Sequence, residues 1–374
     1  MQRFQLESIK KDLEKKMVFL VGPRQSGKTW LAKEIAKLFR SSIYLNYDSL
    51  DDKKIIDEQA WNPETELIIF DELHKKTDWK NYIKGVFDTK NEKTKILVTG
   101  SARLDIYDHI GDSLAGRYFR HRLLPFSLSE VSKVSEADYE LNHFLERGGF
   151  PEPFLATDSI DAERWRQQYI NSLIAIDVFS IEQIQNLNAF RLLFEMLRKR
   201  VGSPISFNSL AEDLQVSSNT VKKYIELLEA LFIVFRVVPF SKNIARSLLK
   251  EPKIYFFDTA LVELDAGARF ENFVAISLLK SIYAENDYLA KEKKLQYIRT
   301  KDCAEVDFAI TEKDKLELMI EVKLSDKKPA RALMNFQKKY NYKALQLVQN
   351  LNKPRFDSGI DIQPGKAYLK SLFL

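Results

Sequence analysis

The sequence contains a single cysteine, Cys303, among its 374 residues, and it has no long apolar run. One cysteine cannot form an internal disulfide, which excludes a disulfide-stabilised secreted domain and favours a reducing compartment. Apolar runs such as "ALFIVF" fall far short of the roughly 18 residues that suggest a membrane-spanning helix. The first 16 residues are amphipathic and charged, without the apolar segment of a signal peptide. We therefore expect a cytoplasmic protein with no membrane contact.

Histidine and net charge are low as well. The four histidines, at positions 74, 109, 121 and 143, do not show the spacing of metal ligands. The net charge of +5 is uneven, because residues 241–374 carry 24 Lys and Arg against 18 Asp and Glu, whereas the first 240 residues carry 34 against 35. This positive C-terminal third favours a phosphate-rich partner such as DNA or RNA, although a solvated lysine-rich surface explains it about as well.

The sequence does contain a regular alternation of strands and helices near its start. With 45% hydrophobic and 30% charged residues, the composition is typical of a globular protein, and the length allows two or three domains. The pattern predicts strands in residues 17–22, 42–48, 66–72 and 93–101 and helices in 3–16, 28–40 and 79–87. The strands are apolar on both faces, which indicates a parallel sheet covered on both sides.

The stretch "GPRQSGKT", from Gly22 to Thr29, matches the phosphate-binding pattern G-x-x-x-x-G-K-[ST]. It follows an apolar strand and precedes a helix, so backbone N–H groups and the helix N-terminus can bind phosphates. We expect Lys28 to contact the β- and γ-phosphates of ATP and Thr29 to hold Mg²⁺. A glycine turn with an incidental lysine is the weaker alternative. The predicted nucleotide-binding residues are Gly22, Pro23, Arg24, Gln25, Ser26, Gly27, Lys28, Thr29 and Trp30.

Two acids follow the third predicted strand, in "LIIFDEL". Asp71 stands at the strand end, where it can bind the Mg²⁺ shell, and Glu72 can orient and deprotonate the attacking water. Acids often end strands for solubility alone. After a phosphate-binding loop, with one extra strand between, the pair predicts a site for ATP hydrolysis.

Polar residues after the next predicted strand are candidates for sensing the γ-phosphate. In "ILVTGSA", Thr99 or Ser101 can hold the attacking water, and a simple turn around Gly100 explains either residue nearly as well. Beyond them, "SLAGRYFRHR" contains Arg117 and Arg120. Either can be an arginine finger, within the chain or across a subunit interface, or can pair with surface acids. We favour Arg117 as the finger.

The motifs "GPRQSGKTWL", "IIFDELHK", "VTGSA", "SLAGR", "LLPFSLSE" and "GGFPEP" occur in the order seen in a widespread group of prokaryotic AAA-type ATPases. The chain resembles this group over essentially its whole length. The resemblance implies an additional-strand ATPase core with Glu72 as catalytic base. It also implies a C-terminal domain of unknown function, and it brings no established substrate.

The middle of the chain resembles a winged helix-turn-helix. The pattern predicts a helix in residues 208–213, a turn in 215–218, a second helix from Asn219 and a strand in "FIVFRVVPF". Lys222 and Lys223 on the second helix suit DNA binding, yet residues 204–240 are slightly acidic. A role as spacer or protein contact is therefore the alternative.

Acids in the C-terminal third resemble the metal site of PD-(D/E)xK nucleases. Asp307 lies on one predicted strand, and Glu321 and Lys323 share one face of the next. In such nucleases the acids bind Mg²⁺ and the lysine stabilises charge. Glu271 is a possible further ligand and Glu305 a competing one. Strands commonly carry such residues on a solvated face, and folds of this type also persist without catalysis, so cleavage is the less favoured hypothesis.

The predicted fold class is α/β. It comprises a P-loop, AAA-type parallel sheet core in residues 1–130, a helical and winged-helix segment in 131–240 and a nuclease-like domain in 241–374. We expect an Mg²⁺-dependent ATPase that acts as a molecular switch for its C-terminal modules. The alternatives are an ATP-gated nucleic-acid-binding protein or metal-dependent nuclease, and an ATPase that docks a protein partner or self-associates.

Overall fold

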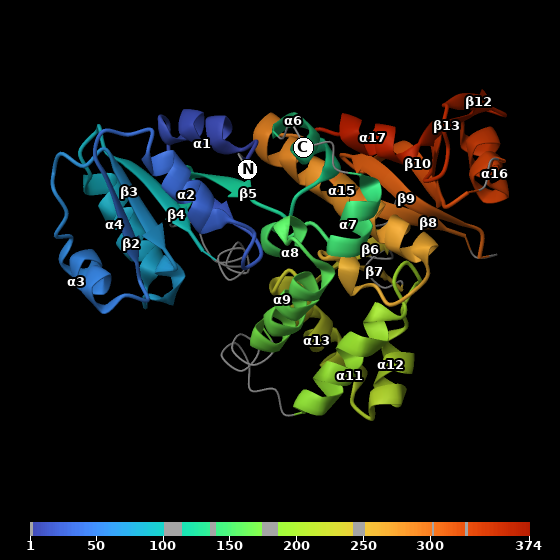
Figure 1. Ribbon diagram of the computed structural model, residues 1–374, viewed down its shortest axis with the longest axis horizontal. Coiled ribbons are helices and arrows are strands. Elements are labelled where there is room, and N and C mark those ends of the chain that lie inside the picture. Colours follow the sequence, from blue (N-terminus) through green and yellow to red (C-terminus); the bar gives the residue numbers. More distant parts are fainter. Residues whose placement is uncertain are drawn as a thin grey trace. The chain divides into compact units, whose positions relative to one another are not determined.

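The computed structural model describes residues 3–100, 114–134, 140–173, 186–241, 251–300, 303–325 and 328–374. The chain divides into two compact units, Met1–Pro125 and Phe126–Leu374 (Figure 1). This division lies close to the predicted boundary at residue 130. Among the described helices, none combines the length and the apolar character that crossing a membrane requires.

A five-stranded parallel sheet forms the centre of the first unit. Its strands are β1 (Met17–Val21), β2 (Ser42–Asn46), β3 (Leu67–Asp71), β4 (Lys95–Thr99) and β5 (Tyr118–Arg122). They lie in the order β2-β3-β4-β1-β5, and each neighbouring pair is parallel. Because β4 separates β1 from β3, the predicted additional-strand sheet is confirmed.

Helices cover both faces of this sheet. They are α1 (Leu6–Leu13), α2 (Lys28–Ala36), α3 (Leu50–Glu58) and α4 (Trp79–Thr89), and a short turn of 3₁₀ helix, η1 (Leu73–Lys75), follows β3. Successive strand residues point to opposite faces. Val18 and Ile69 pack with α1 and α2, whereas Phe19 and Phe70 pack with α3 and α4. The expected burial of both faces is therefore confirmed.

The edge strand β5 is one element that the sequence pattern does not predict. Its sequence "YFRHR" lacks an apolar alternation, and only His121 is fully buried. The strand forms because it pairs with β1, with Tyr118 opposite Met17. The register therefore places the start of β5 beside the start of β1.

The second unit begins with a series of helices. They are α6 (Leu128–Val134), α7 (Leu141–Arg147), α8 (Pro151–Leu155), α9 (Ser159–Ser172), α11 (Leu187–Arg198), α12 (Phe207–Leu214) and α13 (Ser218–Ala230). α12 and α13 correspond to the two helices predicted for the helix-turn-helix. The side chains of Ser206 and Ser217 cap the N-termini of α12 and α13, which fixes where each helix begins.

The rest of the second unit comprises an eight-stranded mixed sheet and the helices that pack on it. The strand order is β12-β13-β11-β10-β9-β8-β6-β7. The longest helix, α15, contacts β7, β8 and β10, and α16 contacts β9, β10 and β11. The elements are β6 (Val234–Pro239), β7 (Lys253–Phe256), η5 (Thr259–Leu261), α15 (Ala266–Leu289), β8 (Lys293–Arg299), β9 (Glu305–Glu312), β10 (Lys315–Lys323), α16 (Arg331–Tyr340), β11 (Lys343–Val348), β12 (Arg355–Asp357), β13 (Ile360–Pro364) and α17 (Gly365–Ser371).

The predicted division between residues 240 and 241 runs through this sheet. β6 lies before the division, and it pairs with β7 in antiparallel and with β8 in parallel orientation, both of which lie after it. The strand predicted as the wing of the helix-turn-helix is thus part of the same sheet as the acid-bearing strands β9 and β10.

Candidate functional site

The loop between β1 and α2 has a conformation that requires glycine at two positions. Gly22 has a φ of +149°, and a Cβ there would lie 2.3 Å from the carbonyl oxygen of Leu123. Gly27 has a φ of +94° and caps α2, a fully described helix with no acid in its first turn. The buried Ser26 hydroxyl has no hydrogen-bond partner among the described residues. Backbone N–H groups at this helix end are therefore available to an anion.

Lys28 is buried within the loop itself. Its Nζ donates hydrogen bonds to the carbonyl oxygens of Gly22 and Pro23, at 3.0 and 2.6 Å. Burial lowers the pKa of Lys28 to about 8, and the charges of Glu72 and Asp71 oppose this fall. A buried ammonium that rests on neutral carbonyl oxygens is suited to an anionic partner such as a phosphate.

Asp71, at the end of β3, accepts hydrogen bonds from three hydroxyl groups. Thr29 donates to its Oδ2 at 3.2 Å, Tyr44 donates to the same oxygen, and Thr99 donates to Oδ1. Tyr44 and Thr99 reach Asp71 because β2 and β4 flank β3 in the sheet. Oxygen atoms of Thr29 and Asp71 thus lie together, and oxygen is the ligand type that Mg²⁺ prefers. Thr29 and Asp71, the Mg²⁺ ligands predicted for the P-loop, therefore fit the ion.

Glu72 directly follows Asp71 and has a left-handed backbone, with a φ of 55°. Its Oε2 lies 3.4 Å from Nε2 of His74 and 3.8 Å from Nζ of Lys75. Burial raises the pKa of Glu72, and the charge of Lys75 opposes that rise. A carboxylate with a raised pKa is a stronger base, which suits the predicted role in deprotonating water.

The acids predicted in the second unit also lie together, and they surround a lysine. Lys253, the first residue of β7, is only 1% exposed. Its Nζ lies 2.7 Å from Oε1 of Glu305, 3.6 Å from Oδ1 of Asp307 and 3.7 Å from Oε1 of Glu271. Three elements, β7, β9 and α15, thus bring three carboxylates to one ammonium.

Further contacts extend this group of charges. Lys323 Nζ lies 2.8 Å from Oε1 of Glu321, and the Tyr255 hydroxyl donates to Glu271 at 2.7 Å. Burial and the nearby charge of Asp307 raise the pKa of Glu271 to about 8 and that of Glu321 to about 7. In the described part of the chain, no group of three or more His, Cys, Asp or Glu side chains is arranged to hold a metal ion.

Comparison with protein families agrees with the geometry of the first unit. Residues 14–132 match a family model described as an AAA domain. The first unit thus matches an AAA domain over nearly its whole length and carries a P-loop between β1 and α2. Residues 138–269 and 266–368 match two further families, described as domains of unknown function DUF8612 and DUF4143. The winged-helix and nuclease-like assignments of the second unit therefore stay predictions.

Several known proteins are similar to this chain over a longer stretch than the AAA domain. An uncharacterized protein of Mycobacterium tuberculosis is 28% identical over 309 residues, which cover 79% of this chain and 67% of that protein. An uncharacterized protein of Methanocaldococcus jannaschii is 24% identical over 369 residues, with 88% and 81% covered. A Walker-type ATPase of Pyrococcus abyssi matches in structure with 14% identity and a TM-score of 0.43, over 69% of this chain and 93% of that one. The AAA assignment rests on the family match and the loop geometry.

Arg117 lies away from the P-loop of the AAA domain. It directly precedes β5, whose first residue pairs with Met17 at the start of β1, whereas the P-loop follows the end of β1. A strand of this length separates the two by roughly 15 Å. Nε and Nη2 of Arg117 donate to Asp88 at 2.9 and 3.0 Å. Within its own chain Arg117 is therefore not brought to the nucleotide, and a role across a subunit interface stays a prediction.

The remaining predicted residues of the AAA domain have varied positions. Ser101 lies outside the described residues. Gln25 is exposed with a φ of 59°, and Trp30 on α2 is 42% exposed, so both side chains face outward from the loop region. Arg24 is half-buried in the same loop.

Two residues that matter in the structure were missed by the sequence analysis. Tyr44 stands in a predicted strand, but its contact with Asp71 depends on which strands are neighbours. Lys253 begins the apolar stretch "KIYFF", and a lysine at the start of a buried strand was the available signal.

On α13, Lys222 and Lys223 are exposed as DNA binding would require, and Lys222 lies 3.9 Å from Glu226.

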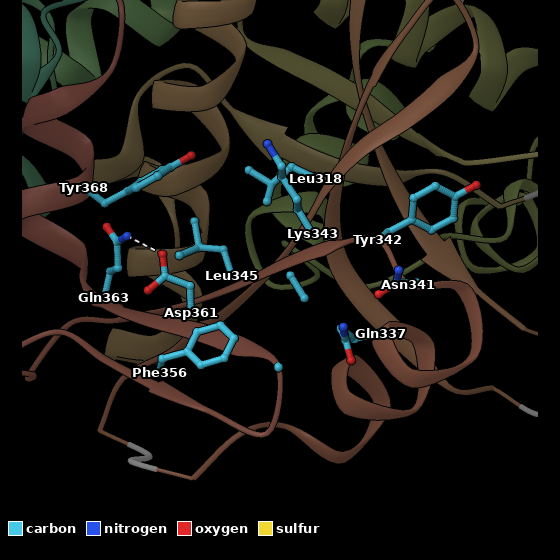
Figure 2. Close-up of a pocket in the computed structure, with 12 residues that line it drawn as sticks. Leu318, Gln337, Asn341, Tyr342, Lys343, Leu345, Phe356, Asp361, Gln363 and Tyr368 are labelled. Atoms are coloured by element: carbon cyan, nitrogen blue, oxygen red, sulfur yellow. Dashed lines mark hydrogen bonds between the residues drawn. The ribbon is translucent and has the colours of Figure 1, made fainter.

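A hollow of about 430 Å³ lies elsewhere on the second unit (Figure 2). Leu318, Leu345 and Tyr368 supply apolar walls, and Gln363 donates a hydrogen bond to Asp361 at one side. None of the residues predicted for catalysis or binding lines it. This hollow is separate from the acids that surround Lys253.

Proposed function

We propose that the chain binds Mg²⁺ and ATP at the P-loop of its AAA domain and hydrolyses the γ-phosphate bond. The observation that carries this proposal is the arrangement of Asp71. Its carboxylate lies beside the Thr29 hydroxyl at the carboxyl edge of the parallel sheet, and its donors are neutral hydroxyl groups. A cation can replace such donors without leaving a buried charge unpaired.

Each side chain has a role that follows from its contacts. Lys28 would exchange its carbonyl partners for the phosphates, while Thr29 and Asp71 would hold Mg²⁺. Mg²⁺, when bound, neutralises charge on the phosphate oxygens. Glu72 would orient the attacking water and accept its proton, because burial raises the pKa of its carboxyl group.

The proposal includes a switch. The AAA domain and the second unit are parts of one chain, so a nucleotide-dependent change in the first can be passed to the second. Among the expected functions, ATP binding and hydrolysis have the most support, since the family match, the P-loop, Asp71 and Glu72 lie in the same unit.

Hydrolysis by four proteins tests the proposal: wild type, Lys28→Ala, Glu72→Gln and the control Lys37→Ala. Lys28→Ala is expected to lose ATP binding. Glu72→Gln is expected to bind ATP and to release phosphate about 10²- to 10³-fold more slowly, as for loss of a general base. Lys37 follows α2 and pairs with Glu34 on the surface, so its replacement should leave the rate unchanged. Equal phosphate release in all four proteins would refute the site.

A further inference from the structure

Lys253 differs from the other lysines on the strands of the second unit in its burial and in the number of acids around it. Its side chain is 1% exposed, and three carboxylates lie within 4.0 Å of its Nζ. Two of them belong to Glu305 and Asp307 on β9, and the third belongs to Glu271 on α15. The ammonium therefore contacts the predicted ligand Asp307 together with the possible ligand Glu271 and the competing ligand Glu305.

We propose that the Lys253 ammonium takes the place that a divalent cation would need among these acids, so the wild-type chain binds no divalent metal at Asp307 and Glu321. The Lys253 ammonium then serves these carboxylates as a permanent counter-ion. This inference concerns the second unit alone, and it does not depend on the function proposed for the P-loop.

A divalent cation on Asp307 would lie close to the ammonium that already contacts this carboxylate. Mg²⁺ requires oxygen ligands at about 2.0–2.1 Å, which would place it against the carboxylates that already contact the ammonium. Two like charges at that separation repel strongly inside a protein. The ammonium also lies 5.4 Å from the centre of the Tyr297 ring, and the backbone of Lys253 pairs with Val237 on β6. Strand pairing and packing hold the lysine where it is.

One buried carboxylate oxygen near Asp307 accepts no hydrogen bond from the described residues. The Glu321 side chain is only 8% exposed, its Oε1 lies 2.8 Å from Lys323, and its Oε2 has no hydrogen-bond partner among the described residues. Asp307 accepts a hydrogen bond from the Val322 N–H at 2.9 Å, which holds it next to Glu321. If Lys253 were replaced by a neutral side chain, no ammonium would lie beside Asp307, and its carboxylate together with Oε2 of Glu321 could bind a divalent cation.

The first experiment compares wild type with Asp307→Asn in the absence of nucleotide. Free Mn²⁺ is measured by electron paramagnetic resonance as the metal is titrated into each full-length protein. Any Mn²⁺ that binds at Asp71 contributes equally to both, so the difference reports on Asp307. We expect identical binding curves. A wild type that binds one more Mn²⁺ per chain than Asp307→Asn would overturn the proposal.

The second experiment uses Lys253→Met, which keeps most of the length of the side chain and removes its charge. We expect this variant to bind one more Mn²⁺ per chain than wild type, and the double variant Lys253→Met, Asp307→Asn to lose that ion. Lys253→Arg retains a cation and should behave as wild type. A folded Lys253→Met protein without an additional Mn²⁺ would refute the proposal. If Lys253→Met does not fold, the comparison of wild type with Asp307→Asn still decides it.

Discussion

Each unit of this chain contains a lysine beside carboxylates at strand ends, and the two differ in what the lysine contacts. In the AAA domain, Lys28 donates to backbone carbonyls, and Asp71 accepts from neutral hydroxyls. In the second unit, Lys253 contacts the carboxylates directly, and Asp307 is one of them. The same residue types therefore produce two different electrostatic states.

The difference teaches which group of acids is open to a cation. Around Asp71 the charges of lysine and acid are separated, so an anion can join Lys28 and a cation can join Asp71. Around Asp307 an ammonium already lies within ion-pair distance of three carboxylates, and a metal on Asp307 would have to displace it. Removing one member of a buried ion pair is costly, which keeps Lys253 in position.

The largest effect is expected from removing the charge of Lys253, which forms ion pairs in the second unit. Lys253→Met removes a buried ammonium from three partly buried carboxylates, and we expect the free energy of unfolding to fall by about 3–5 kcal/mol. Urea denaturation in metal-free buffer measures this change. The control Lys294→Met removes an exposed pair with Asp314 and should cost less than about 1 kcal/mol. Equal losses in the two variants would contradict the buried role.

An intermediate effect is expected from pH at the P-loop. Lys28 has a pKa of about 8 in the nucleotide-free fold, and bound phosphates would raise that pKa. ATP binding then takes up a proton above pH 8, so affinity is highest below pH 8 and falls as pH rises, by up to about tenfold per pH unit. Calorimetry in buffers of different ionisation enthalpy measures the proton uptake. The control Lys28→Arg stays charged, and a similar pH dependence in that variant would refute the assignment.

The smallest effect is expected at Tyr44, whose hydroxyl group is one of the neutral donors to Asp71. Tyr44→Phe should lower the free energy of unfolding by about 1 kcal/mol without nucleotide, and this loss should shrink with saturating Mg²⁺ and ATP, because the cation replaces the donor. Urea denaturation with and without ligand measures both values. The control Tyr82→Phe removes a hydrogen bond to the Ile56 carbonyl and should lose the same amount in both conditions. A loss at Tyr44 that is unchanged by ligand would mean that the hydroxyl is not displaced.

Much of the AAA domain was predictable because its signals are local. The glycines of the loop, the lysine and threonine at the start of α2, and the acids after β3 each follow from a short run of sequence. Residues that act through neighbouring strands were not predictable in this way. Tyr44 contacts Asp71 only because β2 lies beside β3, and Arg117 is remote from the P-loop only because β5 is parallel to β1.

The sequence by itself determined that β1 leads into a phosphate-binding loop, since backbone conformation and helix start depend on neighbouring residues. It also indicated that Asp307 stands on one strand and that Glu321 and Lys323 share one face of the next. Only the tertiary structure brings Lys253 to Asp307, because β6 brings β7 into the sheet, and Lys253 is more than fifty residues away in sequence from Asp307. A charge that arrives from a distant strand leaves no local pattern, and here that charge decides whether the acids are open to a metal.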